Sequence, residues 1–238
     1  MRQVTIWAHL GAVGLKMDLH LVQASIVVLA ATHNPSLLHP SFLANEGIVP
    51  KEWEWVPQQS FTTPAVSKVQ YVNGLEFIVQ PDRLQVVHPG GTVEQIAGSS
   101  LPDHIARYLE VLPYVPYTAV GLNFTAVFPQ QDAGSFIRDR FLRGEALNLN
   151  GRELRSADVK LSYSDGDGRM QVSLADGGAV IDGSAVNGVL IEGNYHRDVA
   201  EDERLKTALE HLKLYRALVS DFMRNATEIF ERADATQD

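Results

Sequence analysis

Two stretches of the chain repeat one order of hydrophobic and polar segments. The continuous apolar run Ser25–Ala31 predicts a buried strand, and the alternation of apolar and polar residues along Val120–Phe128 predicts a second, half-buried strand. In each stretch a short helical segment, several short alternating strands and a further helix follow. The pattern predicts two pseudo-repeated β-α-β-β-β-α halves, residues 17–113 and 114–238, that pack as a single globular unit.

Turn residues mark hairpins in both halves. Asn73-Gly74 tolerates the positive φ angles that a type I′ hairpin requires, and residues 66–88 around it predict a three-stranded meander. In the second half, Asp165-Gly166-Asp167-Gly168 predicts another hairpin turn. Both Asp176-Gly177-Gly178 and Asp182-Gly183 predict further changes of chain direction.

Each half is predicted to end in a helix. Ser100 is a favoured N-cap residue, and together with Pro102 in the first turn it predicts a helix that ends near Leu112. Residues Glu201–Arg232 predict one continuous helix, because their apolar side chains recur three and four positions apart. The apolar face of this helix is broad, which favours packing on a sheet over packing in a coiled coil. The length of the helix predicts that its far end meets another protomer.

These elements predict an α+β fold. We expect a strongly curved antiparallel sheet, helices on one face, and the long C-terminal helix packed against it. In its order of elements this arrangement is similar to TATA-binding-protein-like and helix-grip architectures. The resemblance concerns topology and rests on no sequence motif, so it implies a shape and not an activity.

Composition and charge narrow the function classes. The 238 residues contain no Cys, which excludes disulfides and thiolate metal sites, and they carry a formal net charge of −9 with no run of Lys or Arg. Nucleic-acid and anionic-membrane binding need a clustered positive field, so both are disfavoured. No apolar stretch reaches the roughly 18 residues of a membrane span. We expect a cytoplasmic protein.

The beginning of the chain allows two interpretations. Residues 1–16 form an uncertain N-terminal extension, in which Arg2 and the apolar residues after it weakly resemble a signal segment. His9 interrupts that run, and no clean cleavage site follows. In the second interpretation, translation begins at Met17.

Two short motifs favour ordinary structure over chemistry. His196-Arg197-Asp198 matches part of a kinase catalytic loop, but the glycine-rich loop, the strand lysine and the metal-binding Asp-Phe-Gly of that chemistry are absent. Asp165-Gly166-Asp167-Gly168 lacks the further oxygen ligands and the distal Glu of an EF-hand. We therefore predict no catalytic residue, no cofactor and no metal from motifs.

Seven residues are the candidates for a pocket or cleft: His88, Asn123, Phe124, Tyr163, Tyr195, His196 and Asp198. The first two are expected to face a common crevice, and the three aromatic residues to line an apolar pocket beneath the C-terminal helix. The two histidines and Asp198 are the polar groups from which a catalytic site would be built.

Three functions remain open from the sequence. The first is a non-enzymatic protein-interaction or regulatory module, which binds a protein partner or forms a homodimer through the C-terminal helix. The second is a small-molecule binder with its pocket between the sheet and that helix. The third is a hydrolase or transferase whose site is assembled from scattered polar residues. The first is favoured because the sequence shows no catalytic signature.

Overall fold

The structure, a computed structural model, describes residues 19–142, 149–152 and 154–235. These residues form an α+β fold around one antiparallel sheet of nine strands. In chain order the strands are β1 (His20–Ala30), β2 (Phe61–Thr62), β3 (Ser67–Gln70), β4 (Glu76–Gln80), β5 (Arg83–Pro89), β6 (Tyr117–Pro129), β7 (Val159–Asp165), β8 (Gly168–Ile181) and β9 (Ser184–Asp198). Across the sheet they follow the order β2-β3-β4-β5-β1-β6-β9-β8-β7, so strands of both predicted halves share one sheet.

The pairing of β1 with β6 forms the centre of the sheet. Three buried apolar pairs lie in register there: Ala24 with Phe124, Ile26 with Leu122 and Val28 with Val120. These side chains form part of one continuous hydrophobic core. The residues that alternate with them point to the opposite face of the sheet, which we call the far face; it includes Ser25 and Asn123.

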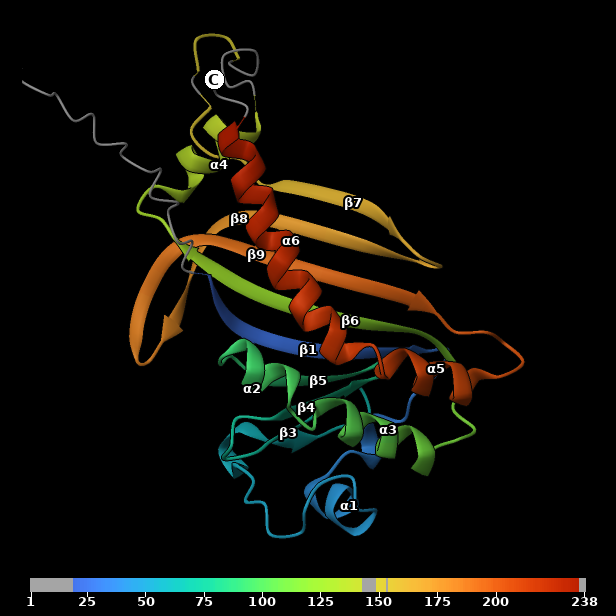
Figure 1. Cartoon of the computed structure of the whole chain (residues 1–238). Helices are drawn as coiled ribbons and strands as arrows, with labels where there is room; N and C mark the ends of the chain where they lie inside the picture. The colour runs from blue at the N-terminus through green and yellow to red at the C-terminus, as the bar shows by residue number, and fades with distance from the viewer. Residues whose placement is uncertain (1–18, 143–148, 153, 236–238) are drawn as a thin grey trace, which may run out of the picture.

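The helices lie on the other side of the sheet. They are α1 (Pro40–Asn45), α2 (Val93–Ala97), α3 (Leu101–Val111), α4 (Ala133–Phe141), α5 (Arg204–Leu212) and α6 (Tyr215–Ala235). Figure 1 shows α6 crossing the sheet, with α2, α3 and α5 gathered below it and α4 beside its C-terminal end. Two 3-10 turns, Pro35–Leu37 and Pro57–Gln59, interrupt the connections on either side of α1.

Aromatic rings fill the space between α6 and the sheet. Phe124 of β6 lies with its ring centroid 5.7 Å from those of both Tyr215 and Phe222 on α6, and 6.0 Å from that of Tyr195 on β9. All four side chains are buried. A Cβ at Gly193 would lie 2.5 Å from the Phe222 ring, so glycine at this position lets α6 approach β9 closely.

The C-terminal helix differs from its prediction. The sequence predicts one continuous helix, but the chain forms α5 and α6 with a turn at Lys213 and Leu214. Backbone bonds from Lys213 to Glu210 and from Leu214 to His211 tighten the end of α5. α5 packs on α3 and β6, whereas α6 packs on α2, β6 and β9. The regular spacing of apolar residues continues across Lys213 and Leu214, so the sequence pattern does not indicate a break in the helix.

The turn predicted at Asp176-Gly177-Gly178 is also wrong. Asp176-Gly177-Gly178 continues within β8, and Asp182-Gly183 alone reverses the chain into β9, with both residues at positive φ. A Cβ at Gly177 would lie 2.5 Å from the Leu190 side chain on the neighbouring strand, so glycine here permits close strand contact. The resulting β8–β9 hairpin extends beyond the sheet and curls at its tip (Figure 1).

Two short elements were missed by the sequence analysis. α2 begins with a capping box, in which Thr92 accepts from Gln95 N while the Gln95 side chain accepts from Thr92 N. This Thr-x-x-Gln signal was visible in the sequence. β2 has two residues and lies in the connector, which is the segment 46–66 between α1 and β3; it gave no detectable periodicity. The predicted extension at residues 1–16 lies outside the described residues.

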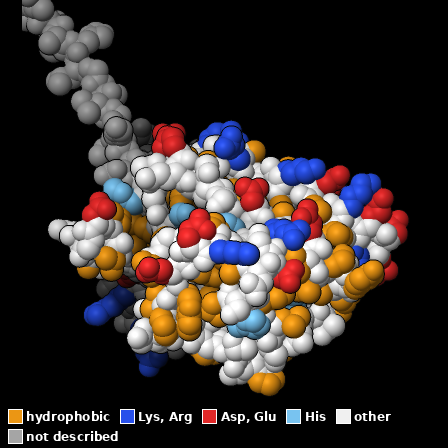
Figure 2. Space-filling model, turned by 90° about the horizontal axis from the view of Figure 1, so that it is seen from below, with side chains coloured by type: hydrophobic (Ala, Val, Ile, Leu, Met, Phe, Trp, Pro, Cys, Tyr) orange, Lys and Arg blue, Asp and Glu red, His pale blue; other side chains and the backbone are white. Residues whose placement is uncertain are grey.

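The surface mixes charge types. Figure 2, which views the molecule from the α1 and β3 end, shows acidic and basic side chains interspersed with apolar ones. This face therefore has no large area of one charge sign to attract a polyion. Within the described ranges, none of the helices combines the length and apolar character needed to cross a membrane.

The packing of α6 gives a direct stability prediction. Replacing Phe222 with Ala removes a fully buried ring that contacts Phe124 and leaves a cavity, so the free energy of unfolding should fall by about 3–5 kcal/mol. Ser220→Ala, on the exposed side of the same helix, should change it by less than about 0.5 kcal/mol. Urea denaturation measures both, and equal values for the two variants would contradict this packing.

Candidate functional site

A surface cavity of about 450 Å³ lies between the β4–β5 meander and the start of α3. Trp53 of the connector, His88 at the end of β5 and His104 of α3 contribute three of its walls. Leu75 and Leu101 add apolar surface, whereas other lining groups are polar. A cavity of this size, with apolar walls and a few polar groups, suits a small organic ligand.

Ser100 and His104 form a hydrogen-bonded pair at the cavity wall. Ser100 Oγ lies 2.9 Å from His104 Nε2, and His104 Nδ1 lies 2.6 Å from the carbonyl oxygen of Ile48. A carbonyl oxygen only accepts, so Nδ1 carries the proton and Nε2 is left with the lone pair. This tautomer makes Nε2 the acceptor for the Ser100 hydroxyl.

The imidazole of His104 is enclosed by aromatic groups. Its ring centroid lies 5.1 Å from that of Trp53 and 6.5 Å from that of Phe77. Burial lowers the pKa of His104, while the Ile48 carbonyl and the Asp103 carboxylate oppose that effect. The side chain therefore remains neutral to a lower pH than a solvated histidine.

Two amide side chains line the same cavity. The Asn73 Oδ1 accepts from Leu75 N at 3.0 Å, and the Gln95 Oε1 accepts from Thr92 N at 2.9 Å. Because the oxygens are held by backbone N–H groups, the NH2 group of each amide is the end left to donate to a ligand. The cavity thus combines apolar walls, a Ser–His pair and amide donors.

The predicted residue Asn123 lies on the far face of the sheet. Its amide nitrogen donates to Ser25 Oγ at 3.5 Å, and its oxygen accepts from the Asn194 side chain. The three residues are in register across β1, β6 and β9. The Asn123 side chain is therefore held in a row of mutually bonded polar groups.

His88 and Asn123 do not share a crevice. His88 is paired with Ala24, which is paired with Phe124, so His88 points to the helix side of the sheet. Asn123 points to the far face. His88 instead lines the cavity beside Ser100, where its Nδ1 contacts the carbonyl oxygen of Pro89.

His196 and Asp198 meet on the far face. His196 Nε2 lies 3.1 Å from Asp198 Oδ1, and the Asp198 side chain is 85% exposed. Gly121 lies directly opposite His196 on β6, so no β6 side chain projects next to the imidazole there. The pair lies away from His88, and the structure does not assemble these three polar candidates into one site.

The three aromatic candidates separate into two places. Phe124 and Tyr195 are buried in the ring cluster beneath α6, where Tyr215 and Phe222 occupy the space next to them. Tyr163 lies on β7 at the edge of the sheet and is 42% exposed. The region where the sequence analysis placed an apolar pocket is therefore filled around Phe124.

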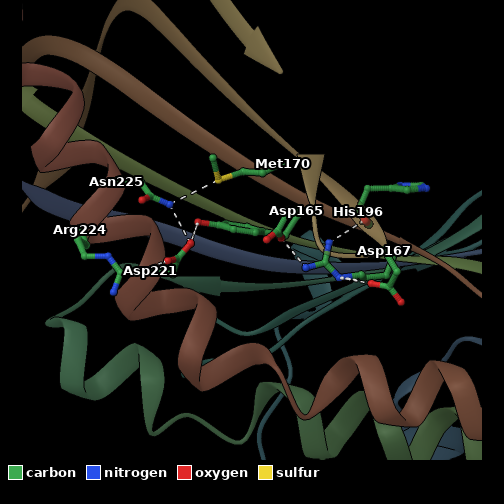
Figure 3. A network of polar contacts seen from close by, with 9 residues as sticks. Asp165, Asp167, Met170, His196, Asp221, Arg224 and Asn225 are labelled. Atoms are coloured by element: carbon green, nitrogen blue, oxygen red, sulfur yellow. Dashed lines mark hydrogen bonds and ion pairs between the residues drawn. The ribbon is translucent and has the colours of Figure 1, made fainter. Parts of the chain in front are cut away.

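A polar network fixes α6 to the sheet (Figure 3). The Tyr195 hydroxyl donates to Asp221 Oδ2 at 3.0 Å, and Asn225 Nδ2 donates to the same oxygen at 2.8 Å. Arg224 pairs with the other oxygen of Asp221. Burial and the nearby Asp221 carboxylate raise the pKa of Tyr195 well above its usual range, so the phenol remains protonated and able to donate.

The Asp-Gly-Asp-Gly segment forms the turn between β7 and β8. Its two carboxylates hold the buried Arg197 of β9: Asp165 pairs directly with the guanidinium, and Asp167 Oδ1 lies 3.7 Å from Arg197 Nε (Figure 3). A Cβ at Gly168 would collide with that guanidinium. These acids thus pair with an arginine, and in the described part of the chain no group of three or more His, Asp or Glu side chains could hold a metal ion.

Sequence reasoning missed Ser100 and His104 as a functional pair. Their spacing of four residues on α3 was visible, and Ser100 was identified as a helix cap. The carbonyl that orients His104 belongs to Ile48, 56 positions earlier in the chain, and no local pattern connects the two. The contact depends on how the connector folds back against α3.

Comparison with models of known protein families and with curated proteins finds no match for this chain.

The buried histidines predict a stability that falls in mild acid. Burial lowers the folded-state pKa of both His104 and His33, so between pH 7 and pH 5 the unfolded chain binds more protons than the folded one. The free energy of unfolding should therefore decrease over this range. Asp82, whose pKa Arg83 lowers, contributes only in stronger acid.

His104→Asn is the matched variant, because its amide nitrogen can still donate to the Ile48 carbonyl without titrating. It should show a smaller loss of stability between pH 7 and pH 5 in urea denaturation. The same pH dependence in both proteins would mean that His104 does not titrate differently in the two states.

Proposed function

We propose that the chain is a protein-interaction protein that works as a homodimer, joined through the edge of its sheet at β7. The observation that supports this most is a difference between the two edges of the sheet. Unpaired edge strands expose backbone N–H and C=O groups and readily pair with another chain. One edge of this sheet is covered by the chain itself, and the other is a seven-residue strand.

The edge at β3 is covered by the connector before it. Val56 N donates to the Gln70 carbonyl at 2.8 Å, and Gln70 N donates to Ser60 Oγ at 3.0 Å. Val72 N donates to the Glu54 carbonyl at 2.9 Å. The two-residue β2 extends this cover, and such a short strand next to prolines offers little for a further strand to pair with.

The edge at β7 has no such cover among the described residues. β8 pairs with one side of β7 along its whole length, and the sheet order ends there. Figure 1 shows β7 as the outermost strand. It contains no proline and no bulge, and in an antiparallel edge strand every second residue directs its backbone N–H and C=O outward.

The residue pattern of β7 suits pairing with itself. In an antiparallel pair centred on Ser162, Leu161 of one copy lies opposite Tyr163 of the other on the helix side of the sheet. Lys160 lies opposite Ser164, so no like charges face each other. The opposite charges of Lys160 and Asp165 cancel, so this strand has no net charge although the whole chain carries a formal net charge of −9.

Within the described residues the sheet has one open edge, which limits the assembly to two copies. Pairing of β7 with β7 consumes the open edge of both chains, and the covered β3 edges cannot extend the sheet further. This gives a closed twofold dimer instead of a fibre. The sequence analysis expected the dimer contact at the far end of the C-terminal helix. The apolar side of α6 is largely occupied by the chain's own core, where Tyr215, Val219, Phe222 and Ala226 are buried.

We also infer that the two halves descend from one β-α-β-β-β-α plan, in the manner of the TATA-binding-protein-like topology. The strand order supports this, because β5, β4 and β3 follow outward from β1 as β9, β8 and β7 follow outward from β6. Superposing these two sets of strands should also bring α4 onto α1. A clear mismatch of these helices would contradict a duplication.

A cytoplasmic location remains our proposal. It rests on the absence of Cys, since a reducing compartment does not support disulfides. Cell fractionation tests it, and recovery of the native protein from a secreted or envelope fraction would contradict it.

The dimer predicts a specific cross-link. The chain has no native Cys, so each single-cysteine variant carries one thiol. Ser162→Cys places that thiol at the proposed twofold axis, where paired Cα atoms lie about 5.5 Å apart, within disulfide range. Under mild oxidation this variant should form a covalent dimer, and light scattering should show the unmodified protein as a dimer.

Ser220→Cys is the matched control, because Ser220 is exposed on the outer side of α6. It should remain uncross-linked. Ser162→Pro removes an outward backbone donor and should shift the protein toward monomer, whereas Ser162→Ala should not. Efficient cross-linking at position 220 instead of position 162 would mean that the dimer interface lies on α6 and not on β7. A strictly monomeric wild-type protein would contradict the dimer altogether.

A further inference from the structure

Ser100, His104 and the Ile48 carbonyl have the arrangement of an activated nucleophile. The hydroxyl and the base are 2.9 Å apart, and a third group holds the base in one tautomer. We propose that this group, at the wall of the 450 Å³ cavity, hydrolyses carboxylic esters through an acyl-serine intermediate on Ser100. This activity goes beyond the proposed interaction function and does not depend on the β7 edge.

The side chain of Ser100 is not used in the way a helix cap is. An N-cap serine normally accepts a bond from a backbone N–H in the first turn, and Ser100 makes no such bond. Its hydroxyl contacts His104 one turn along instead. The residue is exposed to the cavity, so the oxygen is accessible to a ligand there.

The position of His104 makes it a suitable base. The Ile48 carbonyl fixes the proton on Nδ1, so Nε2 is free to accept the proton of the Ser100 hydroxyl. The ring is buried against Trp53, and its pKa is lowered from the ordinary value, so the neutral form is present at neutral pH. A neutral backbone carbonyl here has the orienting role that a carboxylate has in a Ser-His-Asp triad.

Donors for the developing oxyanion lie next to the nucleophile. Because Ser100 does not cap α3, the N–H groups of Leu101 and Asp103 receive no bond from that side chain; Pro102 has no N–H, and His104 N donates to the Ser100 carbonyl. The helix dipole favours negative charge at the same end. The Asn73 and Gln95 amides, with their oxygens already held by the backbone, add NH2 donors across the cavity.

The reaction balances with water as the second reactant. Ser100 Oγ attacks the ester carbonyl carbon while its proton moves to His104 Nε2, and collapse of the tetrahedral intermediate breaks the bond to the alcohol oxygen, which takes that proton. The acyl group is then bonded to Ser100. Water, deprotonated by His104, attacks the acyl carbon, and the carboxylic acid leaves as Oγ regains its proton.

The cavity walls indicate the class of ester. Trp53, Leu75 and Leu101 give it an apolar side, His88 and the two amides give it polar groups, and none of the described residues that line it is Lys, Arg, Asp or Glu. A volume of about 450 Å³ accommodates a small ester and not a long polymer. We therefore assign short, uncharged esters of an aromatic or aliphatic alcohol as substrates.

The test uses the full-length wild-type chain with two probes. An alkyl fluorophosphonate should form a covalent bond from Ser100 Oγ to phosphorus with loss of fluoride, seen as one added mass that peptide mapping places at Ser100. 4-Nitrophenyl acetate and butyrate should be hydrolysed. Labelling of no residue, or of a serine other than Ser100, would overturn the proposal independently of any variant.

Three variants separate the roles. Ser100→Ala should abolish labelling and lower kcat/KM by at least about 100-fold. His104→Asn should lower kcat/KM by a similar factor, although the asparagine side chain can still donate to the Ile48 carbonyl. Ser220→Ala changes an exposed serine on the outer side of α6, which does not line the cavity, and should leave both labelling and rate unchanged. Circular dichroism checks that each variant is folded, and retention of the wild-type rate by Ser100→Ala would also overturn the proposal.

Discussion

The packing of α6 on the central strands is the contact on which the rest of the structure depends. Phe124 lies among Tyr195, Tyr215 and Phe222, so one ring cluster connects β6, β9 and α6. Gly193 permits the close approach, and the bond from Tyr195 to Asp221 fixes the position of the helix. Tyr215 also receives a 3.4 Å contact from Ser99, which extends this support to the cavity wall. The helix positions the cavity as well as closing the core.

The sequence predicts those parts of the fold that local periodicity determines. The central strands, the meander and α3 follow from alternation and turn residues, because burial of one face imposes a period on the chain. The break between α5 and α6 does not, since the apolar spacing continues across Lys213 and Leu214. Asp176-Gly177-Gly178 has the composition of a turn but stays in β8, where its glycines permit close strand contact. In both places tertiary packing decides between local alternatives.

The candidate site was less predictable than the fold. His88 was identified and lines the cavity, but the pair beside it depends on Ile48, which only the folded connector brings to His104. On the far face, Asn123 is hydrogen-bonded to side chains of the two neighbouring strands, and His196 is hydrogen-bonded to Asp198. The cavity and the β7 edge lie at opposite ends of the strand order, with the ring cluster between them. The proposed ester hydrolysis and the proposed association therefore use separate parts of one sheet.

Native-state hydrogen exchange at increasing urea tests most directly whether the ring cluster unites the sheet and α6. If it does, the slowest amides of β6, β9 and α6 open with one free energy and one dependence on urea, because none of the three can open while the cluster is intact. Exchange of the α6 amides through a separate opening, with a lower free energy and a weaker dependence on urea than those of β6, would contradict this account.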